Sequence, residues 1–210
     1  MSGLADGDAT RRPKVAVLDY EIGNLRSAQT ALQRQGADAS LTADADEIAA
    51  ADGVVLPGVG AFGACMAALT ATGLDVEARK AAASGRPFLG ICVGMQMMYE
   101  GSDENPDVEG LGLLGGQVRW LPEGVKRPQM QWNTLRARIE HPLLDGLDGA
   151  WVYFVHSFAP EDGDDVIATT DYGGEITAVA ARDNVMATQF HPEKSARPGM
   201  RLLKNFVEML

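Results

Sequence analysis

The chain has few of the residues that build covalent or metal frameworks. Its 210 residues include two cysteines and three histidines. Two cysteines cannot form the disulfide framework of a small secreted protein, and thiols in such low number favour a reducing compartment, so we expect a cytoplasmic protein. These cysteines and histidines lie far apart in the sequence without the spacing of metal ligands, so we predict no metal site.

Long apolar runs and an excess of basic residues are also missing. No apolar run reaches the length of a transmembrane helix, and the polar segment 1–13 has no apolar core of a signal peptide. The net charge of −11 argues against a broad nucleic-acid-binding surface, which is normally basic. We therefore expect neither a membrane nor a nucleic acid as partner, and we interpret residues 1–13 as a flexible tail.

The composition is that of a folded protein, with 46% hydrophobic and 22% charged residues. Strand-like segments at 14–20, 39–42, 53–58 and 86–91 are followed by segments with helical spacing at 24–36, 44–51, 61–85 and 92–101. This alternation predicts an α/β fold of three layers, in which helices flank a mostly parallel central sheet. We expect residues 14–210 to form a single domain.

The second half of the chain has a different pattern. Gly and Pro punctuate strand-like segments at 116–122, 132–139, 150–158, 165–170, 176–182 and 185–190. These segments predict antiparallel strands or an extension of the sheet in the C-terminal half. A closing amphipathic helix is predicted over 197–210, with Met200, Leu203, Phe206, Val207 and Leu210 on one face.

Cys92 lies in the sequence Gly90-Ile91-Cys92-Val93-Gly94, between a predicted strand and a predicted helix. A Gly-x-Cys-x-Gly sequence at this point has the form of a nucleophile elbow, in which a sharp turn exposes the side chain above the sheet. The flanking glycines relieve crowding, and the start of the helix favours the thiolate form. A buried core thiol is the alternative interpretation, and we prefer it for Cys65, which lies within a predicted helix among alanines.

A thiolate nucleophile needs a base, and His191 is the best placed of the three histidines. It ends the strand-like segment 185–190, whereas His156 lies within an apolar strand and His141 lies in a proline-containing turn. Glu193 can bind the far nitrogen of the His191 ring and fix its tautomer. The sequence therefore predicts a catalytic triad of Cys92, His191 and Glu193.

The segments "GICVGMQ" and "FHPEKS" resemble the class I, triad-type glutamine amidotransferases. The further segments "DYEIGNLRSAQTAL", "LPGVGAFGACM", "MQWNTL" and "YFVHSF" are similar to those of the glutaminase subunits of imidazole glycerol phosphate synthase. The resemblance covers nearly the whole chain after residue 13. It implies a flavodoxin-like fold, and hydrolysis of L-glutamine to glutamate and ammonia through a glutamyl thioester.

The resemblance also implies roles for further residues. The backbone of Val59 and Gly60, together with Val93, would form the oxyanion hole. Gly58, Gln96, Ser157 and Phe158 would bind the substrate. No phosphate loop or dinucleotide fingerprint is present, so we expect no cofactor.

In the family that the chain resembles, the glutaminase passes ammonia to a (β/α)₈-barrel cyclase, with which it forms a heterodimer. Asn24, Trp132, Asn133 and Lys194 match positions that face this partner. Glu21, Gln129 and Gln131 depart from the family's usual residues. Two alternatives remain open: the glutaminase subunit of another synthase, such as that for anthranilate or pyridoxal phosphate, or a catalytically silent regulatory homologue.

Overall fold

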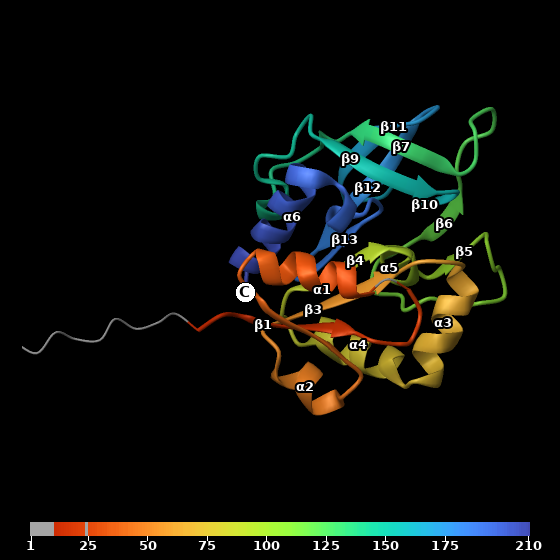
Figure 1. The fold of residues 1–210 in the computed structure, drawn as a ribbon. Coiled ribbons are helices and arrows are strands. Elements are labelled where there is room, and N and C mark those ends of the chain that lie inside the picture. Colours follow the sequence, from red (N-terminus) through yellow and green to blue (C-terminus); the bar gives the residue numbers. More distant parts are fainter. Residues whose placement is uncertain (1–10, 24) are drawn as a thin grey trace, which may run out of the picture.

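The computed structural model describes residues 11–23 and 25–210. Residues 1–10 of the predicted tail and the predicted interface residue Asn24 lie outside this described part. A central sheet of eight strands, in the order β2-β1-β3-β4-β13-β12-β11-β8, organises the fold (Figure 1). Its parallel part consists of β1 (Lys14–Leu18), β2 (Asp38–Thr42), β3 (Gly53–Gly58), β4 (Phe88–Cys92) and β13 (Val185–Thr188).

Antiparallel strands extend this sheet at one edge. They are β12 (Glu175–Arg182), β11 (Val166–Asp171) and β8 (Arg136–Ala137). Two smaller sheets lie beyond them. One contains β5 (Gly101–Ser102), β6 (Gln117–Trp120) and β10 (Phe158–Pro160), and the other is a ribbon of β7 (Gln129–Thr134) and β9 (Trp151–His156). The predicted mostly parallel sheet with antiparallel strands in the C-terminal half is thus confirmed.

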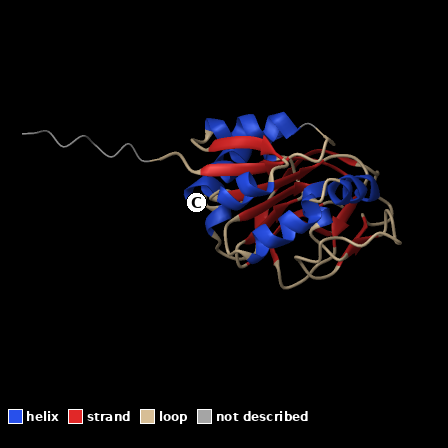
Figure 2. Cartoon of the chain, turned by 90° about the horizontal axis from the view of Figure 1, so that it is seen from below, coloured by secondary structure: helices blue, strands red, loops and turns tan. Residues whose placement is uncertain are grey.

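Helices cover both faces of the sheet, which completes the predicted three layers (Figure 2). One face carries α1 (Leu25–Arg34) and α6 (Ala196–Glu208), and the other carries α2 (Ala45–Ala50), α3 (Phe62–Ala71) and α4 (Leu74–Ala83). The short helix α5 (Val93–Met97) follows β4, and single 3₁₀ turns lie at η1 (Pro142–Leu144) and η2 (Pro192–Lys194). Right-handed crossovers between parallel strands require this placement.

Two predicted helices differ from the structure. The segment 61–85 forms two helices because the chain reverses at Gly73, which adopts a φ of 73° between α3 and α4. The helix predicted over 92–101 ends at Met97, because a neighbouring loop takes its last carbonyls. The N–H of Leu111 donates to the carbonyl of Met97 at 2.7 Å, and that of Leu113 donates to the carbonyl of Met98 at 2.8 Å.

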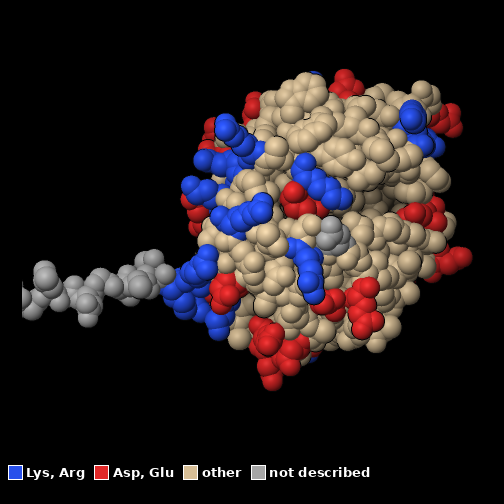
Figure 3. All heavy atoms as spheres, in the orientation of Figure 1, with Lys and Arg blue, Asp and Glu red and all other residues tan. Residues whose placement is uncertain are grey.

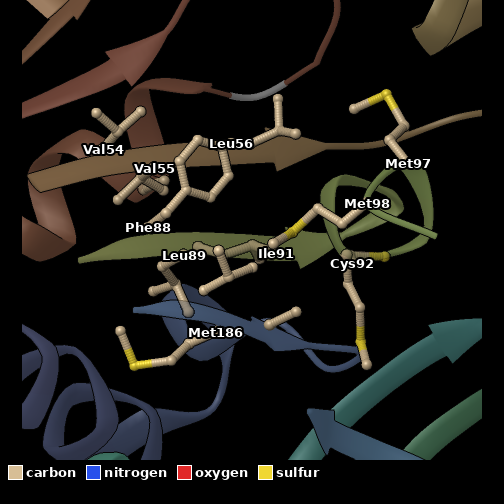
Figure 4. Packing of buried hydrophobic residues seen from close by; sticks show 14 of the residues in the cluster. Val54, Val55, Leu56, Phe88, Leu89, Ile91, Cys92, Met97, Met98 and Met186 are labelled. Atoms are coloured by element: carbon tan, nitrogen blue, oxygen red, sulfur yellow. The ribbon is translucent and has the colours of Figure 1, made fainter. Parts of the chain in front are cut away.

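The core lies between the parallel strands and the helices. Side chains of β3, β4 and β13 pack side by side, with Val55, Leu89 and Met186 fully buried (Figure 4). On the closing helix, Leu203 and Phe206 are buried, and Met200, Val207 and Leu210 are partly buried against the core. Figure 3 shows that basic side chains gather over α1 and α6 while acidic side chains gather over α2, so the excess negative charge is unevenly distributed.

Candidate functional site

Cys92 occupies a strained backbone conformation at the carboxyl end of β4. Its φ is 56° and its ψ is −114°, a combination that side chains with a Cβ rarely adopt. Such strain persists only where the surroundings enforce it. The Cα of Gly94 packs directly against the carbonyl oxygen of Leu56, and that of Gly90 packs against Met98. The glycines on both sides therefore let the chain turn sharply enough to hold the thiol at the end of the strand.

Residues 57–60, which we call the oxyanion segment, lie beside this turn. Gly58 is the register partner of Cys92 in the parallel pair of β3 and β4. A Cβ added to Gly58 would lie 2.5 Å from the backbone nitrogen of Gly94, so the two loops approach too closely for a side chain. The sequence therefore brings the predicted oxyanion residues next to the predicted nucleophile.

Hydrogen bonds hold two carbonyls of the oxyanion segment. The hydroxyl of Tyr20 donates to the carbonyl of Pro57 at 2.6 Å, and the thiol of Cys65 donates to the carbonyl of Val59 at 3.4 Å. Because a trans peptide is planar, the N–H of Gly60 points away from Cys65. Gly60 itself has a φ of 107° and is exposed, and apart from its chain neighbours no atom of residues 11–23 and 25–210 lies within 4 Å of where a Cβ would be.

His191 and Glu193 lie at the end of the neighbouring strand β13. The Nδ1 atom of the His191 ring is 2.8 Å from Oε1 of Glu193. The backbone of His191 is fixed on both sides, because its N–H donates to the carbonyl of Tyr153 at 3.1 Å and its carbonyl accepts from the hydroxyl of Ser195 at 2.6 Å. This arrangement fixes the ring and leaves Nε2 free of the carboxylate.

The electrostatic surroundings favour the charged form of His191. Burial alone lowers the pKa of this imidazole, but its interactions with the side chains of Cys92 and Glu193 outweigh burial and raise the pKa to about 9. The second carboxylate oxygen of Glu193 is buried without a hydrogen-bond partner among the described residues. A positive charge on His191 therefore has an anionic partner on one side and the sulfur on the other.

These residues border one cavity of about 360 Å³. Its walls include most of the predicted site residues, namely Val59, Gly60, Cys92, Val93, Gln96, Ser157, Phe158, His191 and Lys194. Gly58 and Glu193 do not line this cavity and border a much smaller adjoining one instead. Chain segments separated by more than a hundred residues thus meet at the ends of β3, β4 and β13.

The predicted interface residues are not gathered in the same way. Lys194 is exposed at the cavity, whereas Trp132 and Asn133 lie further along the ribbon strand β7. The indole of Trp132 is 43% exposed, and the side-chain amide of Asn133 donates to the carbonyl of Asp171 at 2.7 Å. Their role toward a partner stays a prediction.

Three buried polar residues of the site were not singled out as functional from the sequence: His156, Gln129 and Gln189. His156 lines the cavity, with Nδ1 2.8 Å from the carbonyl oxygen of Phe158 and Nε2 2.8 Å from Oε1 of Gln129. Burial lowers the pKa of His156 to about 4. Gln189 is fully buried beside Cys92. A glutamine within the apolar segment "VMATQF" was the available signal, because a buried amide requires partners.

Within the described ranges 11–23 and 25–210, no three His, Cys, Asp or Glu side chains are arranged to hold a metal ion. No helix of this part is both long and apolar enough to cross a membrane. Both cysteines are free thiols.

Comparison with known proteins identifies relatives along almost the whole chain. The family model described as glutamine amidotransferase class-I matches residues 16–210. The imidazole glycerol phosphate synthase subunit HisH of Natronomonas pharaonis is 46% identical over 207 residues, which cover 94% of this chain and 95% of that protein. The subunit HisH of Methanothermobacter thermautotrophicus is 48% identical over 197 residues, which cover 93% and 98%.

Solved structures share the fold. A crystal structure of a glutamine amidotransferase is 23% identical and superposes with a TM-score of 0.74, covering 93% of this chain and 97% of that one. The structure of PurLQS from Thermotoga maritima is 20% identical, has a TM-score of 0.75 and covers 94% and 99%. At these identities the likeness concerns the fold alone.

Proposed function

Because this chain belongs to the class I glutamine amidotransferase family, we propose that it is the glutaminase subunit of an imidazole glycerol phosphate synthase. The family predicted from the sequence is confirmed. The enzyme hydrolyses L-glutamine and supplies ammonia for histidine biosynthesis. The arrangement of Cys92, His191 and Glu193 at the carboxyl ends of β4 and β13 is the observation that carries the assignment of roles to residues.

In the first half of the reaction, the thiolate of Cys92 attacks the side-chain amide carbon of glutamine. The carbon–nitrogen bond then breaks, and the imidazolium of His191 gives its proton to the departing nitrogen, so that ammonia leaves and a glutamyl thioester remains. A pKa of about 9 for His191 fits this step, because it keeps the ring protonated at neutral pH and therefore able to give a proton to the departing nitrogen.

In the second half, the now neutral His191 removes a proton from water. The resulting hydroxide adds to the thioester carbon, the carbon–sulfur bond breaks, and glutamate leaves while Cys92 returns to the thiolate. The new carboxyl group gives its proton to the solvent, so the sum is glutamine and water giving glutamate, ammonia and a proton. Glu193 holds the ring through Nδ1 in both halves.

Backbone N–H groups around the sulfur stabilise the negative charge on the substrate carbonyl oxygen. This charge develops when the thiolate adds to the amide and again when hydroxide adds to the thioester. We assign the oxyanion hole to the N–H groups of Val59, Gly60 and Val93, which border the cavity beside Cys92. Gln96, Ser157 and Phe158 form the wall that holds the rest of the glutamine. Gly58 lets the oxyanion segment approach the elbow, because any side chain there would collide with Gly94.

Ammonia released into water would be protonated and lost to the synthase, so the site needs a partner that covers it. We propose a cyclase subunit of the (β/α)₈-barrel type as this partner, in a heterodimer. Exposed apolar side chains near the ribbon support such a surface: Trp120, Met130, Trp132 and Trp151. Asn133 and Lys194 would contribute polar contacts. No cofactor is needed for this chemistry, and the free thiols fit a cytoplasmic setting.

The chain offers a matched pair of variants for the assignment of the nucleophile. Cys92 and Cys65 are both buried free thiols. With the cyclase and its ligand present, Cys92→Ala should lose glutamate formation, while Cys65→Ser, which keeps a donor for the carbonyl of Val59, should retain most of it. Glutamate formation that survives in Cys92→Ala would overturn the assignment.

The identity of the partner is tested by measuring glutamine hydrolysis with different synthase subunits. Glutamine hydrolysis should increase when a ligand-loaded cyclase of imidazole glycerol phosphate synthase is added, and it should not respond to the synthase subunit of anthranilate or pyridoxal phosphate formation. The opposite response would identify a different synthase. Absence of hydrolysis with every partner, together with failure of Cys92 to react with a glutamine-like electrophile, would identify a silent regulatory homologue.

A further inference from the structure

Gln189 is a polar side chain with no contact to solvent. It follows Thr188, the last residue of β13, and lies two residues before His191. Its backbone is fixed, because its N–H donates to the carbonyl of Ala178 at 2.9 Å. A primary amide buried in this way loses its hydration, so its oxygen and nitrogen must find partners inside the protein.

Those partners are two residues of the site. Oε1 of Gln189 accepts a hydrogen bond from Nε2 of Gln96 at 3.1 Å, and Nε2 of Gln189 lies 3.9 Å from the sulfur of Cys92. Gln189 thus connects the nucleophile with the residue expected to hold the substrate. It does so from behind the cavity, since it is not among the lining residues.

The hydrogen-bond network fixes which end of the Gln189 amide faces the sulfur. The carbonyl oxygen of Phe158 can only accept, and it receives an N–H of Gln96 at 3.0 Å. The second N–H of the same Gln96 nitrogen points at Gln189, which must therefore present its oxygen there. This leaves the NH₂ end of Gln189 toward Cys92. If the Gln189 amide were flipped, its NH₂ group would face the NH₂ group of Gln96, and neither could accept a hydrogen bond.

We propose that Gln189 is a positioning residue of the glutaminase reaction: its amide N–H donates to the sulfur of Cys92 and favours the thiolate, while its oxygen anchors the amide of Gln96. The inference deepens the proposed function and rests on it. A hydrogen bond to an anionic sulfur is stronger than one to a neutral thiol, so the contact stabilises the reactive form selectively. It also leaves the oxygen of Gln96 as that amide's remaining polar atom for the substrate.

Other titratable groups surround the sulfur and would stay in place when Gln189 is changed. His191, Glu104 and Lys194 border the cavity with Cys92, and Glu193 lies behind His191. Tyr20 and Cys65 lie on the side of the oxyanion segment, where burial raises the pKa of each and keeps both neutral. A change in the titration of Cys92 on substitution of Gln189 would therefore report the lost donor.

The test compares two buried glutamines. Gln189→Met removes the donor with little change in volume, and Gln129→Met is the control, because Gln129 is also fully buried but contacts His156 instead of Cys92. The rate of alkylation by iodoacetamide is measured against pH on the peptide that contains Cys92. The pH of half-maximal rate should rise by about one unit in Gln189→Met, a tenfold loss of thiolate below both midpoints, and should not move in the control.

A second variant keeps the test decisive if methionine impairs folding. Gln189→Glu has the same shape and still accepts from Gln96, but above the pKa of its new carboxyl group it offers the sulfur no donor. Its alkylation midpoint should rise by more than one unit, because a negative charge then faces the sulfur. Midpoints equal to that of the unmodified protein in folded Gln189→Met or Gln189→Glu would overturn the proposal.

Kinetics with the cyclase separate the two contacts. Gln189→Met should lower kcat and raise the KM for glutamine, whereas Gln189→Glu should lower kcat and leave KM nearly unchanged, since Gln96 stays anchored. A raised KM in both variants with an unchanged kcat would contradict the donor role. The alkylation profile requires no glutaminase turnover, so a failure of the proposed function would be seen separately, as an inactive unmodified protein.

Discussion

The elbow at Gly90–Gly94 and the oxyanion segment at 57–60 face the same cavity but are held in different ways. On the elbow, Gly94 packs against the backbone of Leu56 and leaves no room for a methyl group. On the segment, Gly60 is exposed and has open space around it. The nucleophile is thus fixed by close packing, whereas the N–H of Gly60 is held through a few hydrogen bonds and costs less to rearrange. Gly60 is therefore the part of the cavity wall that rearranges at the lower cost.

Adding one methyl group to Gly94 and one to Gly60 tests whether the elbow is packed more tightly than the oxyanion segment. Gly94→Ala forces its Cβ into the carbonyl of Leu56 and should destabilise the fold by about 3 kcal/mol. Gly60→Ala adds a methyl group that meets no other part of the described chain, and it should cost only the strain of its positive φ, about 1–2 kcal/mol. Urea unfolding midpoints measure both. Equal losses would show that the elbow is no more tightly packed than the segment.

The two histidines that line the cavity, His191 and His156, differ in the pKa of their rings. The pKa of His191, beside the elbow, is about 9, and that of buried His156, on the ribbon, is about 4. Relative to an unfolded value of about 6.5, His191 contributes stability at low pH that is lost as the pH rises from about 6.5 to 9. His156 contributes stability at high pH that is lost as the pH falls from about 6.5 to 4.

Unfolding free energies measured across both pH ranges test these opposite slopes. His191→Gln should flatten the curve above about pH 6.5 and leave the acid side unchanged, while His156→Gln should do the reverse. A variant that alters the wrong side would show that the surroundings of the two rings do not differ as the structure indicates.

The strain at Cys92 gives the third comparison, because glycine relieves a positive φ that alanine retains. Neither Cys92→Gly nor Cys92→Ala can form a thioester, so both should be inactive. Cys92→Gly should nevertheless be more stable than Cys92→Ala by about 1 kcal/mol, against the usual preference for alanine. Thermal unfolding of the two variants measures the difference, and greater stability of the alanine variant would argue against strain at the elbow.

The smallest expected effect concerns the loop that supports the oxyanion segment from behind. Glu21 has a φ of 65°, and Gly23 in the same loop packs against the side chain of Val59. Glu21→Gly should raise stability by about 0.5–1 kcal/mol, because glycine adopts this φ without a steric cost. Glu47→Gly in the exposed first turn of α2 is the control and should lower stability by about 1 kcal/mol.

Glu21 also shows how far the sequence could be interpreted. The family usually has glycine at this position, so the departure was visible from the resemblance, but its meaning was not. The structure places Glu21 at a positive φ, where glycine is favoured, and the departure therefore bears on backbone strain. Gln129, a second departure, turns out to be fully buried against His156. It therefore lies inside the ribbon and does not contribute exposed surface to a partner.

The pattern of neighbouring residues was sufficient to predict most strands and helices and to identify Cys92 as the candidate nucleophile. Apolar runs alternating with helical spacing predicted the parallel strands, and the glycines around Cys92 predicted a sharp turn, because both depend on neighbours within a few residues. The same reasoning failed for residues 61–85 and 92–101. There the chain ends its helices at Gly73 and at a loop that takes the carbonyls of Met97 and Met98.

Patterns in the amino-acid order predicted the fold class, the family and a cysteine nucleophile with a histidine base and a glutamate that orients it. They did not predict which buried amides reach the sulfur, how Tyr20 and Cys65 hold the oxyanion segment, or why two histidines of one cavity differ in charge. Hydrogen bonding and burial depend on distances between residues such as Cys92 and Gln189, which lie 97 positions apart. No local pattern encodes such a distance, and packing alone sets it.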